Sequence, residues 1–323
     1  MRRQATTDGS GYNVVAMQTL APGVRYVDLQ FLGRAEVIAT AVLLSAGGAA
    51  LVDPGPSTCL DTLRSTLERH GVGIGDVRQI LLTHIHLDHA GVTGTLMREN
   101  DEVVVYVHER GARHLIDPGR LLESAGRLYG AQMDRLWGQI LPVPADRVRS
   151  LAGGERLVVG DRALEVAYTP GHASHHVSYF DRSSGIAYVG DTAGIRTPHA
   201  EFVLPPTPPP DIDLEAWHGS IERIAAWQPD TLFLTHFGPA GAPAAHLRDL
   251  GDQLRTTSDL VRQSLERGGS DAERFDWFAA EFGRHLRRHL PEPEAARYES
   301  AAPMSYNWQG LARYWRKRTD RRV

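Results

Sequence analysis

Short apolar runs separated by glycine and polar turn residues dominate the first half of the chain and predict β-strands. The runs lie at residues 23–33, 37–45, 48–53, 77–83 and 102–108. Gly47 and Gly48 separate the second run from the third, which is typical of a hairpin. Residues 61–70 show an apolar stripe at helical spacing instead, so strands and helices alternate in this region.

Residues 119–140 repeat large apolar side chains at helical spacing, with charged side chains on the opposite face. We interpret this segment as a helical insert, and it is either a surface helix or a lid over a pocket. A second β-rich block follows at residues 147–191. The prolines of residues 202–211 then exclude a helix or a central strand. Asp213 is placed to cap the next helix, and the last buried strand covers residues 230–239.

After about residue 245 the pattern is wholly helical, and Ser270 with Glu273 predicts a capping box at the start of one helix. We therefore expect two domains, the first of α/β character and the second helical. They are a catalytic domain at residues 1–245, which includes the insert at about 119–140 and a loose lead-in at 1–12, and a C-terminal helical domain at 246–323.

Composition narrows the class of protein. The chain has 323 residues, 42% of them hydrophobic, and a formal net charge of −4, which gives no general attraction to nucleic acid or to an anionic membrane. No run approaches the roughly 20 apolar residues of a membrane span. Cys59 is the only cysteine, so no internal disulfide forms. We expect no signal peptide, a cytoplasmic location and a small-molecule substrate without a nucleic-acid or membrane partner, and we leave a homodimer open.

Histidine and aspartate gather where an apolar strand ends. Four such side chains stand within six positions: His84, His86, Asp88 and His89. Three more each follow another apolar strand: His172, Asp191 and His236. Burying these groups together costs desolvation that a bound cation would offset. Nitrogen and carboxylate ligands without thiolate suit Zn²⁺, with Fe or Mn as alternatives.

The segment THIHLDH resembles the His-x-His-x-Asp-His signature of the metallo-β-lactamase superfamily, and TPGH, GD and THFG follow in that family's order. The resemblance covers roughly residues 20–240. It implies an α/β fold, a four-layer αβ/βα sandwich with a C-terminal helical extension, and two metal ions at one edge.

The resemblance also implies a role for each residue. One metal would bind His84, His86 and His172, the other would bind Asp88, His89 and His236, and Asp191 would bridge both. Asp53, in LVDPG, would orient a ligand histidine without binding metal. His175 and His176 also lie close to His172 in the sequence, and we assign them no role.

By this resemblance the protein is a hydrolase in which hydroxide held by two Zn²⁺ ions attacks the carbonyl of a thioester, lactone or ester. Asp88 would be the catalytic residue that orients the water or accepts its proton. The pattern is similar to glyoxalase II-type hydroxyacylglutathione hydrolases, N-acyl-homoserine lactonases and ribonuclease Z. A phosphodiesterase or nuclease, and an iron-dependent sulfur dioxygenase, are the alternatives. We expect large aromatic side chains in the pocket wall: Tyr129, Trp137, Tyr306 and Trp308.

Overall fold

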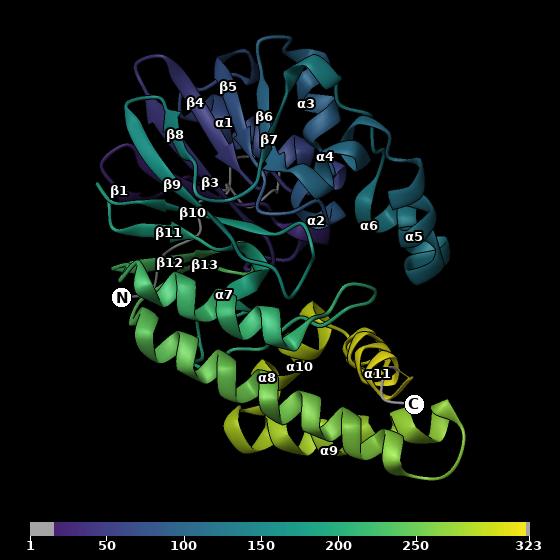
Figure 1. Ribbon diagram of the computed structural model, residues 1–323. Helices are drawn as coiled ribbons and strands as arrows, with labels where there is room; N and C mark the ends of the chain where they lie inside the picture. The colour runs from purple at the N-terminus through teal and green to yellow at the C-terminus, as the bar shows by residue number, and fades with distance from the viewer. Residues whose placement is uncertain (1–15, 321–323) are drawn as a thin grey trace.

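Two β-sheets lie face to face, and helices cover the outer side of each (Figure 1). The structure is a computed structural model that describes residues 16–320, so the expected lead-in at residues 1–12 lies outside the described residues. The arrangement confirms the predicted four-layer sandwich with a C-terminal helical region.

The first sheet has the strand order β1-β2-β3-β4-β5-β6-β7, and β4 to β7 are parallel to one another. Its strands are β1 (Gln18–Ala21), β2 (Val24–Asp28), β3 (Ala39–Ser45), β4 (Gly48–Val52), β5 (Val77–Leu81), β6 (Val104–His108) and β7 (Val148–Leu151). The second sheet has the order β13-β12-β11-β10-β9-β8, with β11 and β12 parallel. Its strands are β8 (Arg156–Val159), β9 (Arg162–Tyr168), β10 (Val177–Asp181), β11 (Ile186–Tyr188), β12 (Thr231–Leu234) and β13 (Gly238–Ala240).

The helices fall into three groups along the chain. The outer side of the first sheet and its extension carry α1 (Leu60–Arg69), α2 (Leu87–Ala90), α3 (Thr93–Glu99), α4 (Glu109–Ile116), α5 (Gly119–Tyr129) and α6 (Met133–Trp137). The helix α7 (Leu214–Ala226) covers the second sheet. The C-terminal helices are α8 (Pro243–Glu266), α9 (Asp271–His289), α10 (Glu292–Ala301) and α11 (Met304–Asp320).

Buried apolar side chains fill each interface between layers. Between the two sheets, Tyr179, Tyr188 and Phe233 are almost wholly inaccessible to solvent. Leu63 of α1 and Leu96 of α3 pack in the core on the outer side of the first sheet. These cores hold the strands in fixed register, and the loops at the carboxyl ends of the strands are therefore held in place as well.

The capping predictions are confirmed, whereas two strand predictions need correction. Asp213 accepts a hydrogen bond from the amide of Ala216, and Ser270 forms a capping box. The predicted strand at residues 23–33 is too long, because β2 ends at Asp28 and the chain turns where Gln30 has a left-handed φ of 50°. The β-rich block at residues 147–191 does not stay together, since β7 joins the first sheet beside β6.

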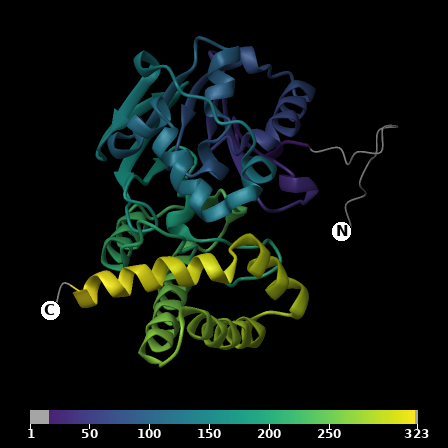
Figure 2. The same cartoon turned by 90° about the vertical axis from the view of Figure 1, so that its right-hand side faces the viewer.

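The insert and the C-terminal helices lie next to each other. Figure 2 shows α11 running below the insert, and the rings of Tyr129, at the end of α5, and Tyr306, in the first turn of α11, are in edge contact with centroids 5.6 Å apart. The first turns of α8 cover the second sheet through Leu247 and Leu250, and its later turns pack on α9 and α11.

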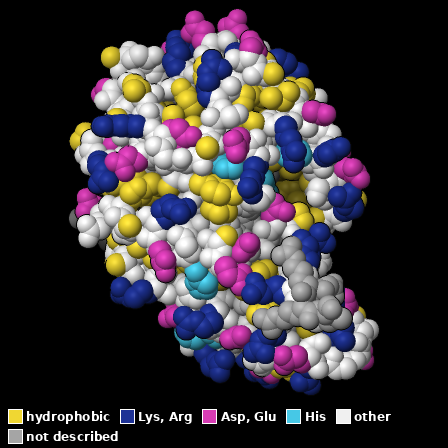
Figure 3. Space-filling view, viewed as in Figure 1, with side chains coloured by type: hydrophobic (Ala, Val, Ile, Leu, Met, Phe, Trp, Pro, Cys, Tyr) yellow, Lys and Arg dark blue, Asp and Glu magenta, His cyan; other side chains and the backbone are white. Residues whose placement is uncertain are grey.

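Charged side chains of both signs cover the face shown in Figure 3, and histidine reaches this surface only in a few places. Among the helices of residues 16–320, none combines the length and the apolar character that a membrane crossing requires.

Candidate metal centre

The strand ends bring the ligand-type residues to one edge of the sandwich. Asp53 follows β4, and the loop after β5 carries His84 and His86 into α2. His172 lies in the loop after β9, Asp191 in the short turn after β11, and His236 directly after β12. The parallel pairs β4–β5 and β11–β12 therefore point their carboxyl ends at the same place from two different sheets.

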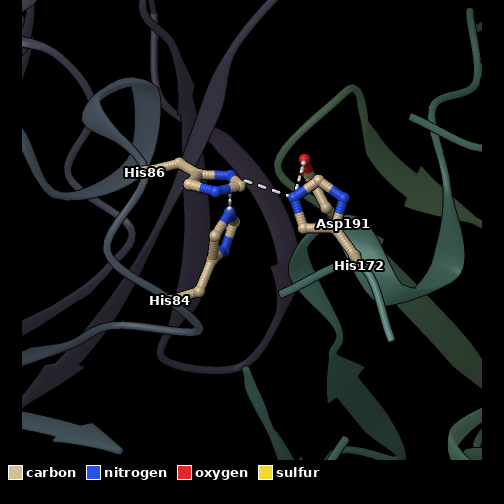
Figure 4. Close-up of side chains that lie close together, drawn as sticks. All are labelled: His84, His86, His172 and Asp191. Carbon is tan, nitrogen blue, oxygen red and sulfur yellow. Dashed lines mark hydrogen bonds and ion pairs between the residues drawn. The ribbon is translucent and has the colours of Figure 1, made fainter. Parts of the chain in front are cut away.

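The first group contains three imidazoles and one carboxylate (Figure 4). The Nδ1 atom of His86 lies 2.9 Å from Nε2 of His84 and 3.0 Å from Nε2 of His172. Asp191 completes the group, with Oδ2 3.3 Å from Nε2 of His172. Each residue offers one ligand atom, and these atoms all lie within 4.8 Å of one another.

The second group contains Asp88, His89 and His236, whose ligand atoms meet the same 4.8 Å limit. Nε2 of His236 lies 3.2 Å from Oδ2 of Asp88, and Nε2 of His89 lies 3.2 Å from Oδ1 of Asp191. The two oxygens of Asp191 thus face different groups, Oδ2 toward the first and Oδ1 toward the second.

The outward nitrogens of four rings have fixed partners. Nδ1 of His172 donates to the carbonyl of Pro206 at 2.9 Å, and Nδ1 of His236 donates to the carbonyl of Val37 at 2.9 Å. Nδ1 of His89 donates to Oδ2 of Asp53 at 2.8 Å, and Nδ1 of His84 lies 3.1 Å from the hydroxyl of Thr83. A proton on each Nδ1 leaves the Nε2 lone pair directed into the cluster, as a metal ligand requires.

The chemistry of the donor atoms fits a pair of cations. Burial and the neighbouring His172 lower the pKa of His86 to about 4, so this ring is neutral at pH 7 and one of its nitrogens keeps a free lone pair. In the second group, burial alone would lower the pKa of His89, but the carboxylates of Asp191 and Asp53 raise it well above its usual value. This half of the cluster therefore attracts positive charge.

Two buried atoms at the centre lack hydrogen-bond partners within the described residues. They are Nε2 of His89 and Oδ1 of Asp191, which lie close to each other without hydrogen-bonding geometry. Buried polar atoms rarely remain unpaired, and a cation between them satisfies both. The cluster is therefore compatible with a binuclear metal site.

Asp53 lies behind the cluster and organises it. Its side chain is fully buried, and its backbone has a left-handed φ of 50°. Oδ1 accepts from the amide of Thr83, and Oδ2 accepts from the hydroxyls of Thr83 and Thr235 in addition to His89. This carboxylate thereby ties together the loops that follow β4, β5 and β12.

A pocket of about 990 Å³ opens beside the first group, and His86 lines it. Of the aromatic residues predicted for its wall, Tyr129 lines the pocket, and Tyr306 packs edge-on against Tyr129. Trp137 supports Tyr129 from behind, since it is buried and stacks on Phe31 with centroids 5.7 Å apart.

The prediction for Trp308 needs correction. Its side chain is 6% exposed and lies in the core of the C-terminal helices, where Nε1 donates to the hydroxyl of Ser264. The apolar stripe of α11 places it there, because that stripe packs on α8 and α9.

Several residues that line the pocket are given no role in the sequence analysis. His175 lines the pocket with a buried Nδ1 that has no hydrogen-bond partner within residues 16–320. Its position three residues after His172 is the signal that could have identified it. Five arginines also line the pocket, but in the sequence they look like the ordinary polar faces of helices: Arg110, Arg113, Arg120, Arg127 and Arg313.

Relatives of this chain carry metal-dependent hydrolase names. The probable metallo-hydrolase YqjP of Bacillus subtilis is 24% identical over 242 residues, which are 69% of this chain and 75% of YqjP. A hydroxyacylglutathione hydrolase of Maricaulis maris is 31% identical over 155 residues, but the match spans only 48% of this chain and 46% of that enzyme.

An archaeal metallo-beta-lactamase fold-containing protein of Sulfurisphaera tokodaii is 30% identical over 162 residues, which are 49% of this chain and 60% of that protein. The match thus spans less than two thirds of that relative's length. The crystal structure of this archaeal protein superposes with a TM-score of 0.61 and 21% identity over 90% of this chain and 98% of the other, which shows the shared fold.

The model of the metallo-beta-lactamase superfamily matches residues 34–236, a segment that contains all seven residues of the cluster. The matched segment is more than half of the chain. The chain therefore belongs to the metallo-beta-lactamase superfamily, as the histidine–aspartate motif predicts.

Proposed function

We propose that this protein is a metal-dependent hydrolase that breaks the acyl C–S or C–O bond of a thioester, lactone or ester after hydroxide attacks the carbonyl carbon, as hydroxyacylglutathione hydrolases do. One observation carries the proposal: two adjoining groups of nitrogen and oxygen donors share Asp191, and one of them reaches the pocket through His86. The nitrogen-rich donor set favours Zn²⁺ over Fe or Mn.

Two divalent cations in this cluster would supply a water molecule of lowered pKa and a Lewis acid for the carbonyl oxygen. The side chains around them hold the geometry of the reaction. Asp88 is the residue best placed to orient the water and accept its proton, because its side chain is 22% exposed whereas that of Asp191 is 6% exposed. Asp53 keeps His89 in the tautomer that directs Nε2 inward.

The pocket wall supports a carbonyl substrate with an apolar part. Leu121 and Leu128 of α5 line the pocket together with Tyr129. Burial and the nearby charge of Asp88 raise the pKa of the Tyr129 hydroxyl, so it stays protonated and can donate a hydrogen bond to the substrate. An oxyanion that forms at the carbonyl would be stabilised by such a donor.

The alternatives predict different substrates for the same cluster. A nuclease would need a long groove that follows the nucleic-acid backbone, whereas His86 here lies in a pocket with leucine and proline in its wall. An iron-dependent sulfur dioxygenase would consume oxygen.

A substrate panel tests the proposal. We expect turnover of S-D-lactoylglutathione or an acyl-homoserine lactone, little turnover of bis-p-nitrophenyl phosphate, and no oxygen uptake. Preferred hydrolysis of the phosphodiester would replace the proposal by a phosphodiesterase. Oxygen consumption with iron in the protein would replace it by the dioxygenase.

A further inference from the structure

The pocket beside the metal cluster is bordered by positive charge. Three helices supply five guanidinium groups: Arg110 and Arg113 from α4, Arg120 and Arg127 from α5, and Arg313 from α11. Only two carboxylates, those of Glu109 and Asp211, line the same pocket. This excess contrasts with the formal net charge of −4 of the whole chain.

Most of these arginines have no carboxylate partner within the described residues. Arg127 pairs with Glu123 at 2.7 Å, whereas Arg113 donates to His114 and Arg110 lies over the ring of Tyr168. Arg120 and Arg313 make no hydrogen bond or ion pair in the part of the chain that the structure describes.

Elsewhere on the helices, exposed arginines commonly pair with an acid three or four residues away. Arg255 with Asp252, and Arg262 with Glu266, are examples. The guanidinium groups of Arg120 and Arg313 are therefore left available for an anion that the described chain does not supply.

The charged border and the metal cluster share one pocket. His86 and the apolar side chains of Leu121 and Leu128 line the same pocket as the arginines, which project from exposed positions on the helices. Figure 3 shows Lys and Arg side chains close to the histidines that reach the surface. A volume of about 990 Å³ is large enough for a substrate with a long arm.

We infer that the substrate carries phosphate groups on the arm remote from its scissile carbonyl, and that the arginines of α4, α5 and α11 bind them. This inference rests on the proposed hydrolase function. Phosphate groups match a lining of five guanidinium groups and two carboxylates more closely than glutathione does, because glutathione carries an ammonium group besides its two carboxylates. One guanidinium group can donate two parallel hydrogen bonds to two oxygens of a phosphate. Several guanidinium groups together balance the charge of several phosphates.

The test compares thioesters that share the scissile bond. Acetyl-coenzyme A carries phosphates, S-acetyl-N-acetylcysteamine is its neutral truncation, and S-acetylglutathione carries carboxylates and an ammonium group. We expect wild-type kcat/KM to be highest for acetyl-coenzyme A and to fall with added NaCl most steeply for that substrate, because exposed charges are screened and it carries the most negative charge.

The variants Arg120→Gln and Arg313→Gln should each lower the ratio of kcat/KM for the coenzyme A thioester to that for the neutral thioester by about tenfold. Arg248→Gln is the matched control, because Arg248 is an exposed arginine of α8 outside this pocket. It should leave the ratio unchanged. Equal losses on the charged and neutral thioesters, or faster turnover of the glutathione thioester, would overturn the inference.

A binding measurement separates this inference from the proposed function. Desulfo-coenzyme A has the phosphates but no thiol for a metal, and calorimetric titration of the metal-loaded protein should show binding that Arg120→Gln and Arg313→Gln weaken. Such binding without hydrolysis of any thioester, lactone or ester would support the arginine site and reject the hydrolase. Hydrolysis of thioesters without binding of desulfo-coenzyme A would support the hydrolase and reject the arginine site.

Discussion

Asp53 and His89, 36 residues apart in the sequence, are joined by a hydrogen bond of 2.8 Å between Oδ2 and Nδ1. Both side chains are fully buried. The bond fixes the orientation of the ring and places the free Nε2 next to Asp191. Asp53 therefore acts on the metal cluster through His89, although none of its oxygens belongs to either group of ligand atoms.

Replacing Asp53 with asparagine should weaken metal binding. An amide can still accept from the Thr83 backbone through its oxygen, but its NH2 group then faces the position of His89 Nδ1. His89 would then carry its proton on Nε2. This nitrogen would lose the lone pair that a metal ligand needs. We expect metal affinity to fall by about 10- to 100-fold, measured by competition with a chromogenic chelator.

Asp181→Asn provides the control for this variant. Asp181 is also fully buried and hydrogen-bonded, to Arg162, Ser183 and Ser184, but it lies at the end of β10, outside both groups of ligand-type residues. It should lower the melting temperature and leave metal affinity unchanged. Equal metal affinity in both variants would show that the bond to His89 does not orient a ligand.

Asp88→Ala should remove activity. The variant loses the carboxylate that lies 3.2 Å from His236 and is more exposed to solvent than that of Asp191. We expect kcat to fall by at least about 100-fold on whichever substrate is hydrolysed, because a proton acceptor contributes this much. Asp101→Ala, at an exposed position in the loop before β6, is the control. Near-wild-type activity of Asp88→Ala at unchanged metal content would refute the proposed role.

Tyr129→Phe tests the role of the Tyr129 hydroxyl while the ring stays in place. Phenylalanine keeps the edge contacts with Trp137 at 5.1 Å and Tyr306 at 5.6 Å, so the melting temperature should not change. We expect kcat to fall by about 100-fold if the hydroxyl stabilises the oxyanion, as single donors of this kind do. Tyr306→Phe should change kcat by less than about twofold, because Tyr306 does not line the pocket. Equal effects of the two variants would contradict the assignment.

The ligand cluster could be predicted because its residues are tied to strand ends. Each run of apolar residues identifies a buried strand, and His84, Asp191 and His236 follow such runs within a few positions. Parallel pairing then brings those positions to one edge whatever the details of the loops. The layers follow from the same alternation of strands and helices.

The pocket could not be predicted in the same way. An apolar stripe shows that a helical residue is buried but not what it packs against, so Trp308 and Tyr129 look alike in the sequence although only Tyr129 lines the pocket. The end of β2 depends on the left-handed conformation of Gln30, which no sequence pattern indicates. Arg120 and Arg313 line one pocket because α5 and α11, which are far apart in the sequence, touch at Tyr129 and Tyr306.

Metal analysis by mass spectrometry on the purified protein, combined with a chelation and reconstitution assay, tests the central claim most directly. We predict about two ions per chain, mainly zinc, with activity that disappears on chelation and returns when zinc is restored. Full activity in protein stripped of metal would contradict the account.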